Sequence, residues 1–182
     1  FRTEGMHAYL PAELNAGHRI AVQPLSDDFT DVASGVVAST VTAPDQEAPT
    51  LFKHAGMYYL LHGDVCCFCP QGSDAKVLVA ADPMGNWTHV ANLNPYGRGR
   101  HVAAQSNSVF EVGLANGSTQ LVWTGDLWQS ARSGLKGDDV QFWLPLEFEW
   151  RSGVVAGADA PVAVPRPVRW VDSFELELPP AD

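Results

Sequence analysis

No stretch of this sequence that is long enough for a helix escapes interruption by glycine or proline. The chain has 16 Gly and 13 Pro among its 182 residues, spread along its whole length. Both residues disfavour the interior of a helix. Short runs rich in β-branched and aromatic residues recur instead, bounded by turn residues. We therefore expect an all-β antiparallel protein, which is a sandwich, a barrel or a propeller.

Two dipeptides predict tight hairpins between neighbouring runs. Ala55-Gly56 and Asn116-Gly117 each separate two β-rich runs, and such pairs favour the turns that join antiparallel strands. The proline-rich residues 154–169 are expected to form a surface loop before the last strand. The expected strands cover residues 18–25, 50–54, 57–62, 76–81, 88–93, 108–112, 120–124, 140–146 and 168–178.

A repeated piece favours the propeller among these architectures. Residues 58–64 and 121–126 both read as an aromatic-rich strand that ends in Gly-Asp. A four-stranded propeller blade takes roughly 40–60 residues, which fits the separation of the two pieces. The repeat is inexact, so a sandwich or barrel stays open at this point.

Charge and hydropathy exclude several classes of partner. The chain carries 21 acidic and 11 basic residues, a net charge of −10. Nucleic acids and anionic membrane surfaces are bound through basic patches, so neither is expected as a partner. No apolar run approaches the roughly 20 residues of a spanning helix. The hydrophobic share of 46% is enough for a packed core.

The three cysteines lie together at Cys66, Cys67 and Cys69. Near-adjacent cysteines rarely pair, because a disulfide needs a specific Cα separation. We expect ordinary loop or core cysteines, with a redox or metal-binding role as the alternative.

Carboxylates and aromatic rings are the candidate functional groups, because signatures such as G-x-S-x-G and the P-loop are missing. Glu47 precedes a very apolar strand, where burial raises the pKa of a carboxyl group toward that of a general acid. Its alternative is an ordinary glutamate at a strand edge. Asp64 and Asp126 end the two repeated strands near aromatic residues, which suits sugar binding or simply an aromatic core. Asp138 and Asp139 are expected to lie in a solvated turn.

Several segments, in the same order, resemble glycoside hydrolase family 43, with the galactan 1,3-β-galactosidase-like branch as the best subgroup. EAPTLFKHAGMYYLL (47–61) resembles the general-acid strand of that family. The other matches are AYL (8–10), LSDDF (25–29), DPMGNW (82–87), QSNSV (105–109), GDLW (125–128), FWLPL (142–146) and WVDSF (170–174).

The resemblance implies the C-terminal part of a five-bladed β-propeller built of antiparallel four-stranded blades. About three blades are then present, and residues 1–182 form a single partial domain whose N-terminal blades are missing. The family implies an inverting glycosidase that cleaves β-galactosyl, or β-xylosyl or arabinosyl, linkages of a polysaccharide. The alternative is a non-catalytic carbohydrate-binding propeller or an inactive fragment. A carbohydrate substrate favours an extracellular or secretory location.

The resemblance also implies roles for individual residues. Glu47 matches the general acid, and Gln105 matches the glutamine at the base position. Because an amide is a poor base, Gln105 needs a neighbouring carboxylate or an imidic tautomer. Asp64, Phe68, Asp126 and Trp128 are expected sugar contacts, with Phe68 in place of a tryptophan and Leu127 in place of an arginine. The usual Asp base and the Asp that tunes the acid precede the matched region. No cofactor is expected; some members hold Ca²⁺, but the sequence identifies no ligands for it.

Overall fold

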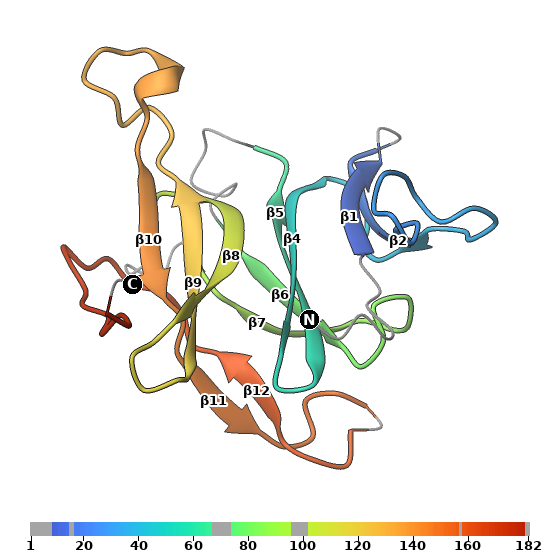
Figure 1. Ribbon diagram of the computed structural model, residues 1–182. Coiled ribbons are helices and arrows are strands. Elements are labelled where there is room, and N and C mark those ends of the chain that lie inside the picture. Colours follow the sequence, from blue (N-terminus) through green and yellow to red (C-terminus); the bar gives the residue numbers. More distant parts are fainter. Residues whose placement is uncertain (1–8, 15–16, 67–73, 96–101, 157, 181–182) are drawn as a thin grey trace.

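Antiparallel β-strands make up almost all of the regular structure (Figure 1). The computed structural model describes residues 9–14, 17–66, 74–95, 102–156 and 158–180, and within 11–14 it describes the backbone alone. In this part of the chain the one helical element is the 3₁₀ turn η2 (Lys136–Asp138). The predicted all-β class is confirmed.

The strands form four antiparallel sheets whose members follow one another in chain order. The sheet β4–β5–β6–β7 has the four strands and the up-and-down order of a propeller blade. The sheets are β1 (Tyr9–Leu14), β2 (Arg19–Pro24), β3 (Ser39–Thr40); β4 (Gln46–His54), β5 (Met57–Asp64), β6 (Lys76–Ala80), β7 (Thr88–Asn92); β8 (Gln105–Gly113), β9 (Thr119–Asp126), β10 (Gln141–Pro145); and β11 (Phe148–Arg151), β12 (Val162–Pro165).

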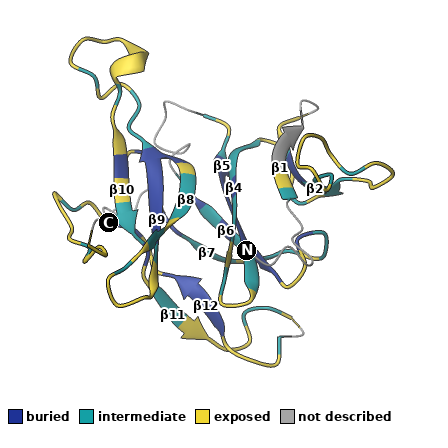
Figure 2. Ribbon diagram, in the orientation of Figure 1, coloured by how far each residue is buried: buried dark blue, intermediate teal, exposed yellow. Residues whose placement is uncertain are grey.

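The main core lies between the sheet β4–β7 and the sheet β8–β10. Tyr59 and Trp123 are fully buried there. Both satisfy their polar atoms: the Tyr59 hydroxyl donates to the Ala163 carbonyl (2.6 Å) and the Trp123 indole N–H donates to the Ser106 hydroxyl (3.0 Å). Figure 2 shows the buried residues gathered along β9 and β12, with exposed residues at the turns. Because β4 also contacts β8, the first strands of the two sheets lie side by side.

The expected strands from 18–25 to 140–146 are all found, and both hairpins are confirmed. The expected strand at 168–178 is wrong. Its backbone makes isolated hydrogen bonds to different segments, from the Val168 N–H to the Leu93 carbonyl and from the Ala115 N–H to the Glu177 carbonyl. Alternation of apolar residues predicts a face, but a strand also needs a neighbour with which to form a ladder.

The expected loop at 154–169 contains a strand instead. β12 is buried along its whole length and pairs with β11, which the sequence did not predict. Because both faces of β12 are covered, its residues do not alternate, and the prolines around it suggested a loop.

Candidate functional site

Glu47 and Gln105, the predicted catalytic pair, touch each other directly. Glu47 comes from β4 and Gln105 from β8. The Gln105 side-chain amide donates to Oε1 of Glu47 at 2.7 Å. The backbone N–H of Cys66 donates to the same oxygen at 3.1 Å. Gln105 is only 6% exposed and Glu47 is half-buried, so two donors converge on one carboxyl oxygen at the edge of the core.

A β-bulge directs Glu47 toward β8. On β4 the register passes from Glu47 opposite Gly63 to Thr50 opposite Leu61, so β4 holds one extra residue. Pro49 lacks an N–H for the ladder, and Ala48 takes a left-handed φ of 55°. In a regular strand, residues 47 and 50 would face opposite sides. With the bulge both face β8, where the Thr50 hydroxyl donates to the Asn107 carbonyl (2.8 Å).

A second bulge lies beside Gln105. On β8 the register shifts between Ser106 and Ser108, which leaves Asn107 as the extra residue. The Asn107 side chain turns outward and donates to both carboxylate oxygens of Asp126, each at 3.1 Å. Bulges are enriched beside active sites because they re-aim side chains. Here both strands that carry the candidate pair contain one.

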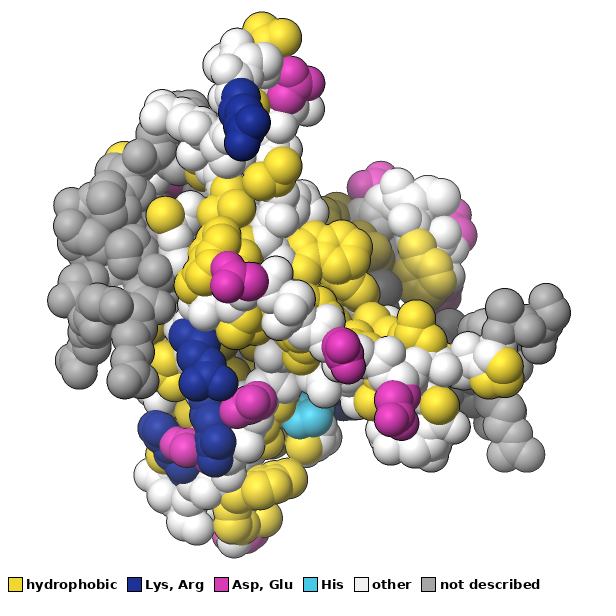
Figure 3. Space-filling view, turned by 90° about the vertical axis from the view of Figure 1, so that its left-hand side faces the viewer, with side chains coloured by type: hydrophobic (Ala, Val, Ile, Leu, Met, Phe, Trp, Pro, Cys, Tyr) yellow, Lys and Arg dark blue, Asp and Glu magenta, His cyan; other side chains and the backbone are white. Residues whose placement is uncertain are grey.

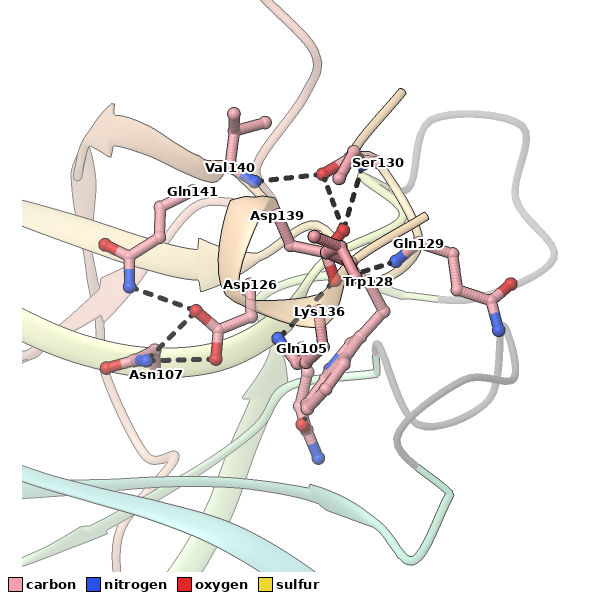
Figure 4. A network of polar contacts seen from close by, with 12 residues as sticks. Gln105, Asn107, Asp126, Trp128, Gln129, Ser130, Lys136, Asp139, Val140 and Gln141 are labelled. Carbon is pink, nitrogen blue, oxygen red and sulfur yellow. Dashed lines mark hydrogen bonds and ion pairs between the residues drawn. The ribbon is translucent and has the colours of Figure 1, made fainter. Parts of the chain in front are cut away.

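Trp128 fixes the orientation of the Gln105 amide. The indole N–H of Trp128 donates to Oε1 of Gln105 at 2.9 Å (Figure 4). An indole N–H can only donate, so the carbonyl end of the amide must face Trp128. The NH₂ end then faces Glu47. Three of the residues predicted from the sequence therefore form one chain of hydrogen bonds.

Asp139 organises the loop that follows Trp128. Its side chain is only 6% exposed and accepts the backbone N–H groups of Gln129 (3.1 Å) and Ala131 (3.0 Å). The bond from Ala131 is the main reason that the pKa of Asp139 is lowered, with help from Gln129 and the charge of Lys136. Lys136 lies 3.5 Å from Asp139 and places its ammonium 3.5 Å from the centre of the Trp128 ring. The prediction of a solvated turn is wrong for Asp139.

Asp126 and Asp64, the two Gly-Asp aspartates, are each held between the first and third strands of their own sheet. Besides Asn107, Asp126 accepts the Gln141 side-chain amide at 3.0 Å. It is also the register partner of Gln105, so it lies beside the candidate pair.

Asp64 is held differently. Its Oδ1 forms an ion pair with Lys76 and accepts the Gln46 amide at 2.9 Å. Partial burial acts to raise the pKa of Asp64, but the hydrogen bonds from Lys76 and Gln46 outweigh it, and the pKa is lowered. These interactions tie Asp64 to its own sheet, and no hydrogen bond in the described part of the chain joins it to the Glu47–Gln105 pair.

Phe68, the remaining predicted sugar contact, lies outside the described residues. Cys66 is disulfide-bonded, with a partner outside the described residues. The expectation of ordinary unpaired cysteines is therefore wrong for Cys66.

No metal site is found in the described part of the chain. No group of three or more His, Cys, Asp or Glu there is placed to hold an ion. None of the described helical structure is long and apolar enough to cross a membrane.

Lys136, Asp139 and Asn107 were missed as site residues by the sequence reasoning. A weak signal existed for Asp139, because aspartate near glycine and serine often accepts backbone N–H groups in a turn. Nothing in the sequence marks the contact of Lys136 with Trp128, which depends on the path of the whole loop.

The comparisons with known proteins return solved structures alone: no protein-family model and no curated protein matches the chain. An exo-β-1,3-galactanase from Clostridium thermocellum matches with a TM-score of 0.64 and 26% identity, over 78% of this chain and 29% of that one. A GH43 β-1,3-galactosidase matches with a TM-score of 0.62 and 22% identity, over 86% and 30%.

A third match is an exo-β-1,3-galactanase from Phanerochaete chrysosporium, solved with β-1,3-galactotriose. Its TM-score is 0.60 and its identity 21%, over 87% of this chain and 32% of that one. The chain thus spans less than a third of the length of each of these three structures. Their shared fold confirms the predicted partial propeller.

Proposed function

We propose, from the likeness of this chain to glycoside hydrolase family 43 propellers, that it carries the general-acid part of a glycosidase. The whole protein would hydrolyse O-glycosidic bonds of a polysaccharide, with β-galactosyl linkages favoured by the similar galactanases and β-xylosyl or arabinosyl linkages as further candidates. The observation that supports this most is the 2.7 Å bond between Glu47 and Gln105, made from two bulged neighbouring strands. Residues 1–182 would be one partial domain, completed by blades outside this chain.

Glu47 would donate a proton to the leaving glycosidic oxygen. Its Oε1 already accepts two N–H groups, from Gln105 and Cys66. In the neutral carboxyl group the acidic proton therefore belongs on Oε2. Because the donors hold Oε1 in place, they also fix the direction in which Oε2 presents its proton to the sugar.

Gln105 would act as a positioning residue for Glu47. An inverting reaction needs a base about 6.5–9.5 Å from the acid, with room for water and the sugar between them. Gln105 is in direct contact with Glu47, so its observed side-chain position is too close for that task. To act as the base, as the family resemblance implies, Gln105 would have to rotate away and break its bonds to Glu47 and Trp128. We propose that the base comes from a blade outside this chain.

Trp128 and Asp126 are the sugar contacts that the geometry supports best. Trp128 presents a partly buried ring next to Gln105, and an aromatic face suits the C–H face of a sugar. Asp126 keeps a carboxylate on the surface beside Gln105, where it can accept sugar hydroxyl groups. Asp64 is engaged by Lys76 and Gln46, and contributes to the stability of its own sheet.

A non-catalytic carbohydrate-binding protein is the second candidate. The observation that favours it is that Oε1 of Glu47 accepts hydrogen bonds from an uncharged amide and a backbone N–H. Such a site can bind sugar hydroxyls without catalysis. The two candidates differ in whether Glu47 must exchange a proton.

Replacing Glu47 by glutamine in the full-length protein tests the proposal. We expect Glu47→Gln to lower the rate of β-1,3-galactan hydrolysis by about 10²–10⁴-fold, since it removes the acidic proton, while β-1,3-galactotriose still binds. Glu111→Gln, at an exposed position on β8, is the matched control and should keep full activity. Undiminished turnover by Glu47→Gln would overturn the acid assignment. Binding of the sugar without any turnover in the unmodified protein would favour the second candidate.

A further inference from the structure

The ring of Trp128 is already covered by a cation. Lys136 places its ammonium 3.5 Å from the ring centre, although its side chain is 53% exposed to solvent. An ammonium over an indole face is attracted by the negative face of the ring. A sugar that stacks on the same face, which borders the pocket, competes with Lys136 for it.

Lys136 has a second partner that stays in place if the ammonium leaves the ring. The carboxylate of Asp139 lies 3.5 Å away and is held by the N–H groups of Gln129 and Ala131. Two left-handed residues, Gln129 (φ 60°) and Gly134 (φ 73°), shape the loop around it. Figure 4 shows Lys136 beside Trp128 and Asp139. The ammonium can thus move away from the ring without losing its ion pair.

The space around this contact is large enough for a ligand group. A pocket of about 420 Å³ is lined by Trp128, Gln129, Gly134, Lys136 and Asp139. Trp128, which lines this pocket, also donates a hydrogen bond to Gln105, which in turn donates to Glu47. The pocket therefore adjoins the candidate pair. The side of the molecule around β10, seen in Figure 3, presents hydrophobic side chains interspersed with both acidic and basic ones.

We propose that Lys136 covers Trp128 in the free protein, is displaced by the sugar ring that binds there, and so sets the affinity of this subsite. This rests on the proposed function, in which Trp128 is a sugar contact. Each neutral sugar has to displace the ammonium before it stacks on that face, so Lys136 lowers the affinity of the subsite for any such sugar by about the same factor. The displaced ammonium stays paired with Asp139.

The test is calorimetric binding of β-1,3-galactotriose to the full-length protein and its variants. Lys136→Ser removes the competing cation, and we expect binding about two- to five-fold tighter, from the strength of an exposed cation–π contact. Lys136→Arg should weaken binding, because a planar guanidinium stacks on an indole more strongly than an ammonium does. Unchanged or weaker binding by Lys136→Ser would overturn the proposal.

Lys53→Ser is the matched control. Lys53 also lies over an aromatic ring, 4.9 Å from the centre of Tyr58, on the far end of the β4–β5 hairpin. Its replacement should leave galactotriose binding unchanged. Trp128→Ala separates the two proposals: if this variant binds as tightly as the unmodified protein, Trp128 is not a sugar contact and the proposed function is wrong at that residue. If Trp128→Ala loses binding while Lys136→Ser does not gain it, the role of Lys136 alone is wrong.

Discussion

The sheet β4–β7 and the sheet β8–β10 follow one plan with different chemistry. In both, a bulged first strand carries a member of the candidate pair, and the second strand ends in Gly-Asp. In both, the aspartate is held by side chains from the first and third strands. Asp64 in β4–β7 is neutralised by Lys76, whereas Asp126 in β8–β10 is held by the uncharged amides of Asn107 and Gln141.

The residue before each Gly-Asp pair shows the same contrast. His62 and Thr124 are both buried, at 4% and 3% exposure. Thr124 is satisfied, because its hydroxyl accepts the Ser108 N–H at 3.1 Å. In His62, Nδ1 has no hydrogen-bond partner among the described residues. The strand end of β5 thus carries an ionisable histidine and is pH-sensitive, whereas the equivalent position of β9 is an uncharged threonine. In β8–β10 the charge of the Asp126 carboxylate is not neutralised by a lysine and lies beside the candidate site.

The largest expected effect comes from replacing His62 on β5 by threonine, the residue at the equivalent position of β9. Burial, followed by the charge of Lys76, lowers the pKa of His62 from 6.5 to about 4. Between these values the unfolded chain binds a proton that the folded chain does not, so stability falls as the pH drops from about 6.5 to 4. The loss is on the order of 2–3 kcal/mol. His62→Thr should remove this slope in denaturant unfolding measured across that pH range.

The control for this substitution is His89→Thr, at an exposed position on β7. It should keep most of the acid-induced loss, because the charge of His89 is the smallest of the causes that shift the pKa of His62. An unchanged slope in His62→Thr would mean that the strand end of β5 is not the pH-sensitive element, and the contrast with β9 would fail.

The next effect concerns how tightly β9 packs at its Gly-Asp end. A Cβ added at Gly125 would lie 2.8 Å from the Cβ of Ala104 and 2.9 Å from the ring of Trp123. Gly125→Ala should therefore lower the free energy of unfolding by about 1–3 kcal/mol. Gly113→Ala, in the same sheet with nothing within 4 Å of the added Cβ, should cost almost nothing. Equal thermal midpoints for the two variants would show that this strand end can relax.

The smallest effect compares the third-strand partners of the two aspartates. Lys76→Met removes the ion pair of Asp64, and we expect a loss of up to about 1 kcal/mol. Because salt screens exposed charges, that loss should shrink at 1 M salt. Gln141→Met removes a hydrogen bond from an uncharged amide to Asp126, so its cost should depend on salt less than that of Lys76→Met. A salt-independent cost for Lys76→Met would remove the electrostatic contrast between the sheets.

Local patterns predicted the local structure well. Ala55-Gly56 and Asn116-Gly117 place the hairpins, and the repeated Gly-Asp pairs mark equivalent strand ends of two sheets. The predictions failed where a partner distant in sequence decides the outcome. β12 needs the cover of its neighbours to be a strand, and residues 168–178 form no ladder with any strand of the described chain.

The candidate site was predictable only in part, because local motifs mark its residues but contacts between distant segments decide its geometry. Family-like motifs brought out Glu47, Gln105 and Trp128, which the structure joins by hydrogen bonds. Their direct contact depends on two bulges, and a bulge shifts every later side chain to the other face without changing the sequence pattern. The burial of Asp139 depends on a loop closing around it, which residue spacing does not show.

The central claim is that Gln105 acts on the reaction through Glu47, and leaving-group dependence tests it most directly. An activated aryl group leaves a glycoside without being protonated, whereas the leaving sugar of a β-1,3-galactan linkage needs a proton from the acid. The measurement is kcat/KM of Gln105→Ala on both substrates in the full-length protein. We predict a loss on β-1,3-galactan at least about tenfold larger than the loss on the aryl glycoside. Equal losses on both substrates would contradict the account, because they would place Gln105 on the attacking water instead of on the acid.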